Sequence, residues 1–349
     1  MRRAPPLQVV VPASTSNLGP GFDLLGLALS LHLRVELRGT SRSRIERRGT
    51  LAPLRVPFRA DLLVRAAAAL ARRAGARLPR LDLLADSEIP VARGLGSSGA
   101  AVAAGLLLAD ALLGTRLARK ELAAIGADLE GHPENVAASL LGGLVAGRPR
   151  PGGGWLFFRP LHDRRLRAAV AWPSVEIPTE QSRAALPRSV GFDVARDNAR
   201  NLATLLEGLR RLDPDCLRLG IRDGLHVPRR ARRIPAYGAV VEAARRAGAL
   251  AATISGSGSA VLALCASARA ARRAARAMAG AFRDAGAGGE GRALPIAVRG
   301  ARVLGAVDSV GLTPGTAAGG GPPRPGSCTG PPPSRAGGTR ARRARGWPA

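Results

Sequence analysis

Apolar residues in the first half of the chain recur with the periods of strands and helices. From residue 31 to residue 37, Leu and Val at the odd positions alternate with His, Arg and Glu, which predicts a strand with one buried face. Shorter apolar runs predict further strands, and runs of Ala and Leu that stop at Gly predict helices. We therefore expect strands at residues 7–11, 27–37 and 81–85, and helices at residues 62–73, 100–113 and 120–129.

Several breaks interrupt this pattern. Pro12 should end the first strand, and the basic segment 40–57 reads as a hairpin or a loop. Pro133 followed by Glu134 suits the first turn of another helix. Residues 142–154 are rich in Gly and Pro, so we place a domain boundary at residues 155–165.

The second half continues with mixed elements. Leucines at positions 202, 205, 206 and 209 predict an amphipathic helix over residues 198–211. We also expect strands at 166–172 and 301–307 and helices at 239–247 and 266–281. The domains would then be 1–160 and 161–310. The Pro-, Gly- and Arg-rich segment 311–349 should be disordered, and its removal should leave activity intact.

The chain is strongly basic, but its basic residues are scattered, which weakens the case for a nucleic-acid partner. The formal net charge is +28, and Lys120 is the only lysine among the 53 basic residues. Such a charge favours a nucleic-acid partner. However, the arginines are scattered and only 3% of the residues are aromatic, which is poor support for base stacking. We keep a basic RNA-binding protein as a less favoured alternative, and we expect the charge to attract ATP and other anions.

Cysteine usage and the apolar runs indicate a cytoplasmic protein without a membrane anchor. Cys216, Cys265 and Cys328 lack metal-ligand spacing and are odd in number, so we expect reduced thiols. No run of eighteen apolar residues occurs, and the apolar run 7–11 that follows Arg2 and Arg3 is too short for the apolar region of a signal peptide. We therefore expect neither a transmembrane helix nor a signal peptide.

The stretch 90–101, Pro-Val-Ala-Arg-Gly-Leu-Gly-Ser-Ser-Gly-Ala-Ala, is the strongest candidate for chemistry. Gly94 and Gly96 allow the backbone to approach a ligand closely, and Ser97 or Ser98 can cap the helix that follows. The free N–H groups at the start of that helix suit a phosphate. The segment is not a Walker A loop, because no Gly-Lys-Ser/Thr follows. A tight strand–helix turn without a ligand is the alternative interpretation.

The same stretch resembles the second motif of the GHMP kinases, Pro-x-x-x-Gly-Leu-Gly-Ser-Ser-Ala-Ala. The chain departs from it at Gly99, where Ala is usual, and matches it at Pro90, Gly94, Leu95, Gly96, Ser97, Ser98, Ala100 and Ala101. Residues 251–262, which contain Ser255, Gly256, Ser257 and Gly258, are similar to the family's third motif. Ser259 and Ala260 replace its Pro-(Thr/Ser), and we expect no chemistry from Ser255.

Four further segments resemble homoserine kinases within this family. The first matches Val-Pro-Ala-(Ser/Thr)-x-x-Asn-Leu-Gly-Pro-Gly-Phe-Asp-x-x-Gly at residues 11–26. The second matches Glu-Gly-His-Pro-Asp-Asn-Val at residues 130–136, except for Glu134. The others are Thr-x-x-(Ala/Ser)-Arg-x-x-Leu-Pro at 179–187 and Asp-x-(Leu/Ile)-His-x-Pro-(Tyr)-Arg at 223–230. Without this context, His132 would be read as a capped loop residue and the arginines at 229–233 as a solvated face.

The resemblance implies an α+β fold of two domains. The first is a ribosomal-protein-S5-domain-2-like nucleotide domain, and the second is a ferredoxin-like α/β sandwich. It also implies ATP-dependent phosphorylation of L-homoserine to O-phospho-L-homoserine in threonine biosynthesis, with Mg²⁺, by a cytoplasmic homodimer.

The resemblance also implies roles for particular residues. Asp23 and His132 would face the substrate ammonium, Arg183 and Arg230 its carboxylate, and Asn17 and Asn135 its hydroxyl, as the catalytic pair. Ser98 and Glu130 would hold Mg²⁺. ATP would bind Pro90, Val91, Ala92, Arg93, Gly94, Leu95, Gly96, Ser97, Ser98, Gly99 and Ala100. Since Asn135 cannot accept the hydroxyl proton, we expect catalysis by positioning and charge neutralisation.

The chain departs from the family pattern at two further positions, and two alternatives to the function remain. Leu62 stands where homoserine kinases often carry Asn near the nucleotide base, and Arg229 stands where Tyr is usual. A GHMP kinase for another small alcohol is the first alternative, although mevalonate would leave Asp23 unexplained because it lacks an amine. A catalytically inactive relative is the other.

Overall fold

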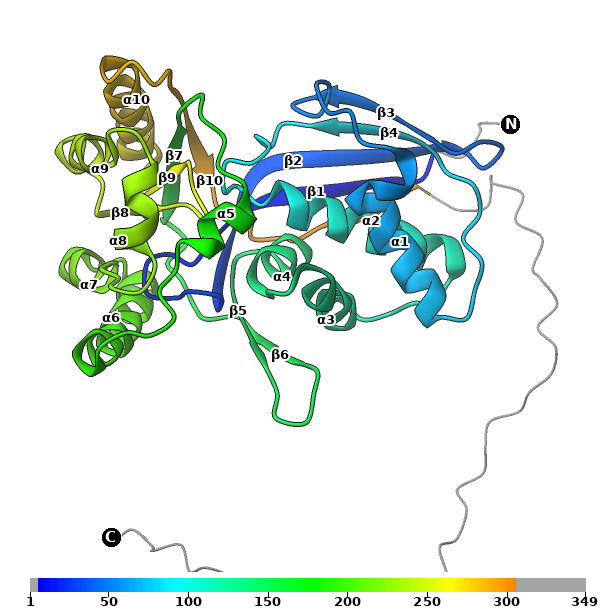
Figure 1. Cartoon of the computed structure of the whole chain (residues 1–349), viewed down its shortest axis with the longest axis horizontal. Helices are drawn as coiled ribbons and strands as arrows, with labels where there is room; N and C mark the ends of the chain where they lie inside the picture. The colour runs from blue at the N-terminus through cyan, green and yellow to red at the C-terminus, as the bar shows by residue number, and fades with distance from the viewer. Residues whose placement is uncertain (1–5, 306–349) are drawn as a thin grey trace, which may run out of the picture. The chain divides into compact units, whose positions relative to one another are not determined.

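The computed structural model describes residues 6–305, which form two β-sheets with helices packed against them (Figure 1). The expected α+β class is confirmed. The predicted disordered segment 311–349 and the end of the predicted strand 301–307 lie outside the described residues.

The first sheet has seven strands and carries most of the first half of the chain. Its strand order is β11-β1-β2-β4-β3, and β5 pairs with both β2 and β6. Only β3 and β4 run parallel. The strands are β1 (Gln8–Ser16), β2 (Leu25–Gly39), β3 (Arg44–Gly49), β4 (Asp82–Ser87), β5 (Leu144–Pro149), β6 (Trp155–Phe158) and β11 (Arg302–Leu304).

Two predictions about this sheet are wrong. Pro12 does not end β1, which continues to Ser16, because the register against β2 shifts between Pro12 and Ala13. Such an irregularity is where a strand tolerates proline. The segment 40–57 contains β3, a strand whose only apolar residue is Ile45. Three arginines, a glutamate and Gly49 make up the rest of it. Charged residues are common in an edge strand, so the apolar pattern could not reveal it.

Four helices cover one face of this sheet (Figure 1). They are α1 (Leu62–Arg73), α2 (Ser97–Leu113), α3 (Arg119–Glu130) and α4 (Glu134–Leu141), and a short 3₁₀ turn, η1 (Phe58–Ala60), precedes α1. The three helices predicted from the Ala- and Leu-rich runs are confirmed, and α1 has the predicted ends. α2 is apolar all round because it is the central helix, with Leu106, Leu107 and Leu108 fully buried.

The second sheet is antiparallel throughout, in the order β10-β7-β9-β8. Its strands are β7 (Arg167–Trp172), β8 (Ala251–Ile254), β9 (Val261–Cys265) and β10 (Glu290–Pro295). Residues of β7 alternate between two cores: Ala168 and Val170 join the larger core, whereas Ala169 and Ala171 face the smaller one. α9 (Tyr237–Arg246) and α10 (Ala268–Asp284) cover the smaller core.

The remaining helices connect the sheets to the site. α6 (Phe192–Arg211) begins earlier than predicted and packs with α7 (Pro214–Gly220) into the larger core through Leu205, Leu209 and Leu217. The short helix α5 (Thr179–Ala184) lies where the two sheets meet (Figure 1), and α8 (Val227–Arg230) is followed directly by the 3₁₀ turn η2 (Ala231–Arg233). β11 returns to pair with β1, and the described residues make one compact unit. The division at residue 160 stays a prediction.

Candidate active site

The glycine-rich loop after β4 presents the free end of α2. Gly94 and Gly96 have φ of 74° and 72°, a conformation that favours glycine. A Cβ at Gly94 would overlap the carbonyl oxygen of Ser255, and one at Gly96 would overlap the Ser14 hydroxyl. The prediction that Ser97 or Ser98 caps the helix is wrong, because Gly96 is the N-cap and no side chain bonds there. The first N–H groups of α2 are therefore free to meet an anion.

The loop at residues 255–258 closes on this glycine-rich loop. The Ser255 hydroxyl donates to the carbonyl oxygen of Gly94 at 2.7 Å and lies 2.8 Å from the Thr15 hydroxyl. The N–H of Gly256 donates to the carbonyl oxygen of Ser16, and Asn17 Nδ2 donates to that of Gly256. These hydrogen bonds hold together three segments that are far apart in the sequence, at residues 15–17, 94 and 255–256. The Ser255 hydroxyl therefore has structural partners, and the absence of a chemical role for Ser255 stays a prediction.

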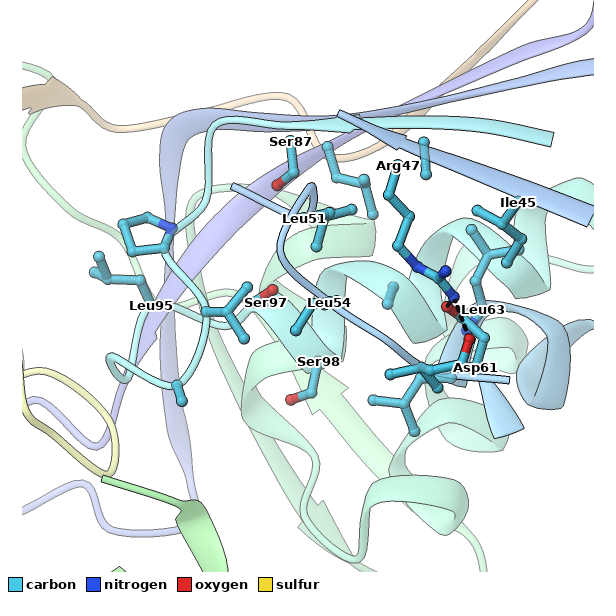
Figure 2. A pocket seen from close by; sticks show the side chains of 18 of the residues that line it. Ile45, Arg47, Leu51, Leu54, Asp61, Leu63, Ser87, Leu95, Ser97 and Ser98 are labelled. Atoms are coloured by element: carbon cyan, nitrogen blue, oxygen red, sulfur yellow. Dashed lines mark hydrogen bonds and ion pairs between the residues drawn. The ribbon is translucent and has the colours of Figure 1, made fainter. Parts of the chain in front are cut away.

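An apolar cavity of about 400 Å³ adjoins the glycine-rich loop (Figure 2). Its volume falls in the range of small-molecule sites. Most of its lining is aliphatic, including Leu62, while Ser97 and Ser98 line it from the loop. Arg47 also lines it: Nη2 donates to Asp61 Oδ2 at 2.7 Å and to the carbonyl oxygen of Val56. This cavity could therefore hold a nucleoside against aliphatic side chains, with the Arg47–Asp61 ion pair on one side.

The guanidinium of Arg93 is engaged by other groups of the protein. Its Nε donates to the carbonyl oxygen of Pro173 and its Nη2 to that of Ser174, and it pairs with Glu176 at 3.3 Å. These contacts tie the glycine-rich loop to the end of β7. Contact between Arg93 and ATP stays a prediction, with the backbone rather than the guanidinium as the available part.

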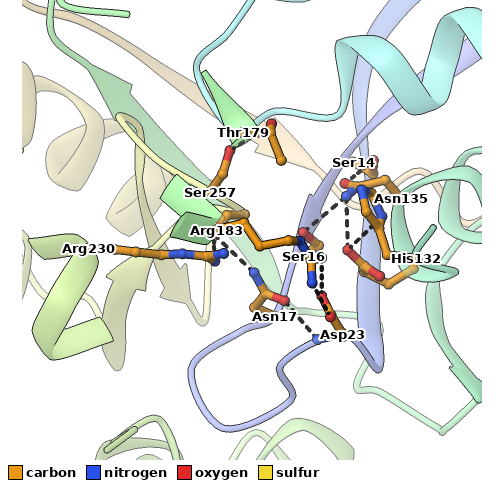
Figure 3. Close-up of polar contacts among 12 residues, drawn as sticks. Ser14, Ser16, Asn17, Asp23, His132, Asn135, Thr179, Arg183, Arg230 and Ser257 are labelled. Atoms are coloured by element: carbon orange, nitrogen blue, oxygen red, sulfur yellow. Dashed lines mark hydrogen bonds and ion pairs between the residues drawn. The ribbon is translucent and has the colours of Figure 1, made fainter. Parts of the chain in front are cut away.

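A small polar cavity gathers all six residues expected to bind the substrate (Figure 3). Gly94, Gly96 and Ser98 line it as well, so it opens beside the glycine-rich loop. Its substrate-side members come from the β1–β2 loop, the start of α4, and helices α5 and α8. They are Asn17, Asp23, His132, Asn135, Arg183 and Arg230.

Two of these residues form a bidentate ion pair. Arg183 Nη1 donates to Asp23 Oδ2 at 2.8 Å, and Nη2 donates to Oδ1 at 2.9 Å. The carboxylate of Asp23 raises the pKa of Arg183 further, chiefly through these hydrogen bonds. Both side chains remain partly exposed to the cavity. A fork–fork pair of this kind has well-defined geometry and can be exchanged for another carboxylate and another cation.

Arg230 is the second cation of the cavity and is only 3% exposed. Burial and the neighbouring charge of Arg183 lower the pKa of Arg230 to about 10, so the group stays charged near neutrality. Its guanidinium lies 5.2 Å from the ring centroid of Phe22, which also faces Arg183 at 5.7 Å. Arg229, by contrast, is exposed, as are Arg232 and Arg233. The motif register that selected Arg230 therefore selected the arginine that lines the cavity.

Asn17 and Asn135 are held by their own hydrogen bonds. Asn17 Oδ1 accepts from the backbone N–H of Asp23, while its Nδ2 is engaged with Gly256. Asn135 Oδ1 accepts from the Ser14 hydroxyl, and its Nδ2 donates to Ser16 and to Glu134 Oε1. Both amides are thus fixed in orientation, which suits positioning a substrate better than moving a proton.

Acidic groups surround His132 on the other wall. Burial alone would lower the pKa of His132, but Glu134, Glu130 and Asp23 outweigh it and raise the pKa to about 9. Its Nδ1 lies 3.3 Å from Glu134 Oε1. His132 is therefore a cation near pH 7, and its contact with a substrate ammonium stays a prediction.

Glu134 is the residue that the sequence analysis passed over. It is 2% exposed, lines the polar cavity, and its Oε2 accepts no hydrogen bond from the described residues. Its position in the first turn of α4 had suggested only a helix start. The signal that could have identified it is that the family motif carries an acid at this place.

Glu130 and Ser98 fit the expected magnesium site. Burial raises the pKa of Glu130 to about 7, although His132 and a hydrogen bond with Ser98 oppose the rise. Its Oε2 is buried and has no partner among the described residues. Residues 6–305 hold no cluster of three or more His, Cys, Asp or Glu suited to a metal. One carboxylate and one hydroxyl are typical protein ligands for Mg²⁺, which otherwise uses phosphates and water.

Comparisons with known proteins place this site in a family. The profile for the GHMP kinases N terminal domain matches residues 61–143, and that for GHMP kinases C terminal matches residues 205–284. A curated relative from Synechococcus sp. (strain CC9902) is 40% identical over 262 residues, which cover 74% of this chain and 83% of the relative. The chain therefore belongs to the GHMP kinase family.

Within this family, the most similar of the reported relatives are homoserine kinases. The Synechococcus protein is named homoserine kinase, as is one from Prochlorococcus marinus (strain MIT 9313) that is 38% identical over 261 residues, 74% of this chain and 83% of that protein. The crystal structure of homoserine kinase from Cytophaga hutchinsonii has a TM-score of 0.76 and 27% identity, covering 85% of this chain and 97% of that one. L. major mevalonate kinase shares the fold alone, at 15% identity and a TM-score of 0.60, with 85% and 96% covered.

Among residues 6–305, no helix is long and apolar enough to cross a membrane.

Proposed function

We propose that this chain transfers the γ-phosphoryl group of ATP to the hydroxyl of L-homoserine, which gives ADP and O-phospho-L-homoserine on the route to threonine. The observation that carries the proposal is the Asp23–Arg183 pair within a cavity that also holds Arg230 and Glu134. An α-amino acid brings one ammonium and one carboxylate, which are the charges needed to satisfy an opened carboxylate–guanidinium pair.

In this proposal, each charged or polar group of homoserine has a partner in the cavity. Its carboxylate would meet Arg183 and Arg230, and its ammonium would meet Asp23 and the free oxygen of Glu134. We replace His132 with Glu134 on the ammonium side because His132 is itself a cation. The side-chain hydroxyl would then point toward Asn135 and the glycine-rich loop, where the phosphoryl group arrives.

The nucleotide would lie on the other side of that loop. Its base and ribose would occupy the apolar cavity, and its phosphates would meet the free N–H groups at the start of α2. Glu130 and Ser98 would hold Mg²⁺, which when bound neutralises phosphate charge. Because Asn135 cannot accept a proton, the chain contributes alignment of the two reactants and fixed positive charge.

ADP release with Mg-ATP tests the proposal against a panel of L-homoserine, L-threonine, L-serine and mevalonate. We expect turnover to be strongest with homoserine. Arg48→Met should leave this turnover unchanged, since Arg48 is exposed on β3 and, among residues 6–305, forms an ion pair only with Glu46. Turnover with mevalonate alone would keep the fold and overturn the substrate site. ATP binding without turnover would favour another alcohol or an inactive relative. A homodimer and a cytoplasmic location remain predictions.

A further inference from the structure

His226 is a fully buried histidine that the proposed chemistry does not use. It stands four residues before Arg230, at the N-cap of α8, and 0% of its surface is exposed. Asp223 fixes its backbone, since Asp223 Oδ2 accepts from the N–H groups of His226 and Val227 at 2.8 and 2.7 Å. The N–H of Arg230 in turn donates to the carbonyl oxygen of His226 at 3.0 Å. The imidazole and the guanidinium are thus held on one short turn.

The partners of the imidazole determine its proton position. His226 Nε2 lies 2.9 Å from the carbonyl oxygen of Gly19, which can only accept, so Nε2 carries the hydrogen. His226 Nδ1 lies 3.4 Å from Arg230 Nη1, which can only donate, so Nδ1 presents its lone pair. The ring is therefore neutral and bridges two parts of the site. Burial, the largest influence, also lowers the pKa of His226.

The two partners of the imidazole, Gly19 and Arg230, both belong to segments that line the polar cavity. Gly19 lies in the β1–β2 loop between Asn17 and Asp23, and the Phe22 ring of the same loop lies 5.2 Å from the imidazole centroid. At the other end, Arg230 Nη1 is shared between His226 and the carbonyl oxygen of Gly256. No hydrogen bond among the described residues engages Arg230 Nη2, so this nitrogen is available to a ligand in the cavity.

We propose that His226 is a positioning residue for the substrate carboxylate: its Nδ1 orients the Arg230 guanidinium, and its Nε2–H holds the loop that carries Asp23. The proposal rests on the proposed function. The Arg230 guanidinium has one face against Phe22, and its edge donates to His226 Nδ1, to the carbonyl oxygen of Gly256 at 3.1 Å and to that of Ser182 at 3.5 Å. Without His226 Nδ1, only the two carbonyl oxygens would orient the guanidinium, and its contact with the substrate carboxylate would weaken.

Steady-state kinetics of His226→Leu, His226→Asn and His226→Gln test the role. His226→Leu removes both bonds, so we expect KM for the amino acid to rise about tenfold, the usual worth of one hydrogen bond to a charged group. KM for ATP should stay within about twofold of the wild-type value, because the nucleotide cavity does not involve His226. His226→Asn keeps an acceptor at the place of Nδ1 and should recover most of the loss.

The controls separate positioning from loss of structure. His226→Gln keeps a donor toward Gly19 but places no acceptor at Nδ1, so its KM should exceed that of His226→Asn. This comparison stands even if His226→Leu does not fold. His162→Leu, at a histidine that lines a different cavity, should leave both KM values unchanged. An unchanged KM in His226→Leu, equal KM values for the Asn and Gln variants, or a matching rise in KM for ATP would overturn the role.

The wild-type rate with homoserine tests the proposed function separately. The ratio of variant to wild-type KM is measured with whichever carboxylate-bearing alcohol the wild type turns over. The role of His226 can therefore fail while the proposed function holds, and the reverse is equally visible.

Discussion

Replacing Gly99 with Ala, the residue usual in the family motif, should lower both the stability and the activity of this protein. Gly99 lies in the first turn of α2, where α4 crosses closely. A Cβ at residue 99 would stand 2.9 Å from the Cβ of Asn135 and 3.1 Å from both the Asn135 carbonyl carbon and the Val136 nitrogen. Carbon atoms in good contact are about 3.5–4.0 Å apart, so relief requires the helices to separate by roughly 0.5 Å.

Two opposing effects set the size of the change. Ala is favoured over Gly in a helix by about 1 kcal/mol. Overpacking a filled interior costs about 1–3 kcal/mol. We therefore expect a net loss of up to about 2 kcal/mol in the free energy of unfolding. Asn135 is hydrogen-bonded to Ser14, Ser16 and Glu134, so a shift of α4 would also move the site that binds the substrate hydroxyl. A misplacement of about 1 Å can lower the rate about a hundredfold, so we expect kcat to fall about tenfold for this smaller shift.

Thermal unfolding and initial rates of ADP release measure both effects. Gly238→Ala is the matched control, because Gly238 is also helical, in α9, and a Cβ there would meet nothing within 4 Å. The control should gain up to about 1 kcal/mol and keep the wild-type kcat. If Gly99→Ala also raised Tm and left kcat unchanged, the steric reasoning would be refuted.

Three further predictions concern the two cavities. Arg183→Met should raise KM for homoserine roughly 10- to 100-fold, because a charge-assisted pair is lost, and leave KM for ATP unchanged in steady-state kinetics. Arg47→Met should raise KM for ATP about tenfold if the Arg47–Asp61 pair contacts the base, while Arg48→Met, on the same strand but exposed, should not; equal values would place the base elsewhere. Because burial raises the pKa of Glu130 to about 7, protons compete with Mg²⁺ below that pH, and affinity for Mg²⁺ in the complex with a non-hydrolysable ATP analogue should fall about tenfold per pH unit; calorimetric titration should show this slope in the wild type and none in Glu130→Gln.

Local chemistry in the sequence determined most of the elements. The helix at residues 62–73 was predicted with its observed ends from a run rich in Ala and Leu that stops at Gly75. The structure adds that the side chain of Asp61 caps its start. The glycine-rich loop was also evident, since Gly94 and Gly96 follow a strand and precede a helix. These features depend on residues within one or two turns of each other, so the sequence carries them directly.

Only the tertiary structure could decide how distant segments meet. Nothing local in the sequence shows that Arg183 reaches Asp23, 160 residues away. The motif register selected Arg230, but only the structure shows that Arg230 is buried and lines the same cavity. The same holds for β3, a charged strand that exists because β4 supplies its backbone partners. Glu134 and His226 stood in the sequence motifs without an assigned role for a similar reason, because the role of a buried polar group follows from the partners that the fold brings to it.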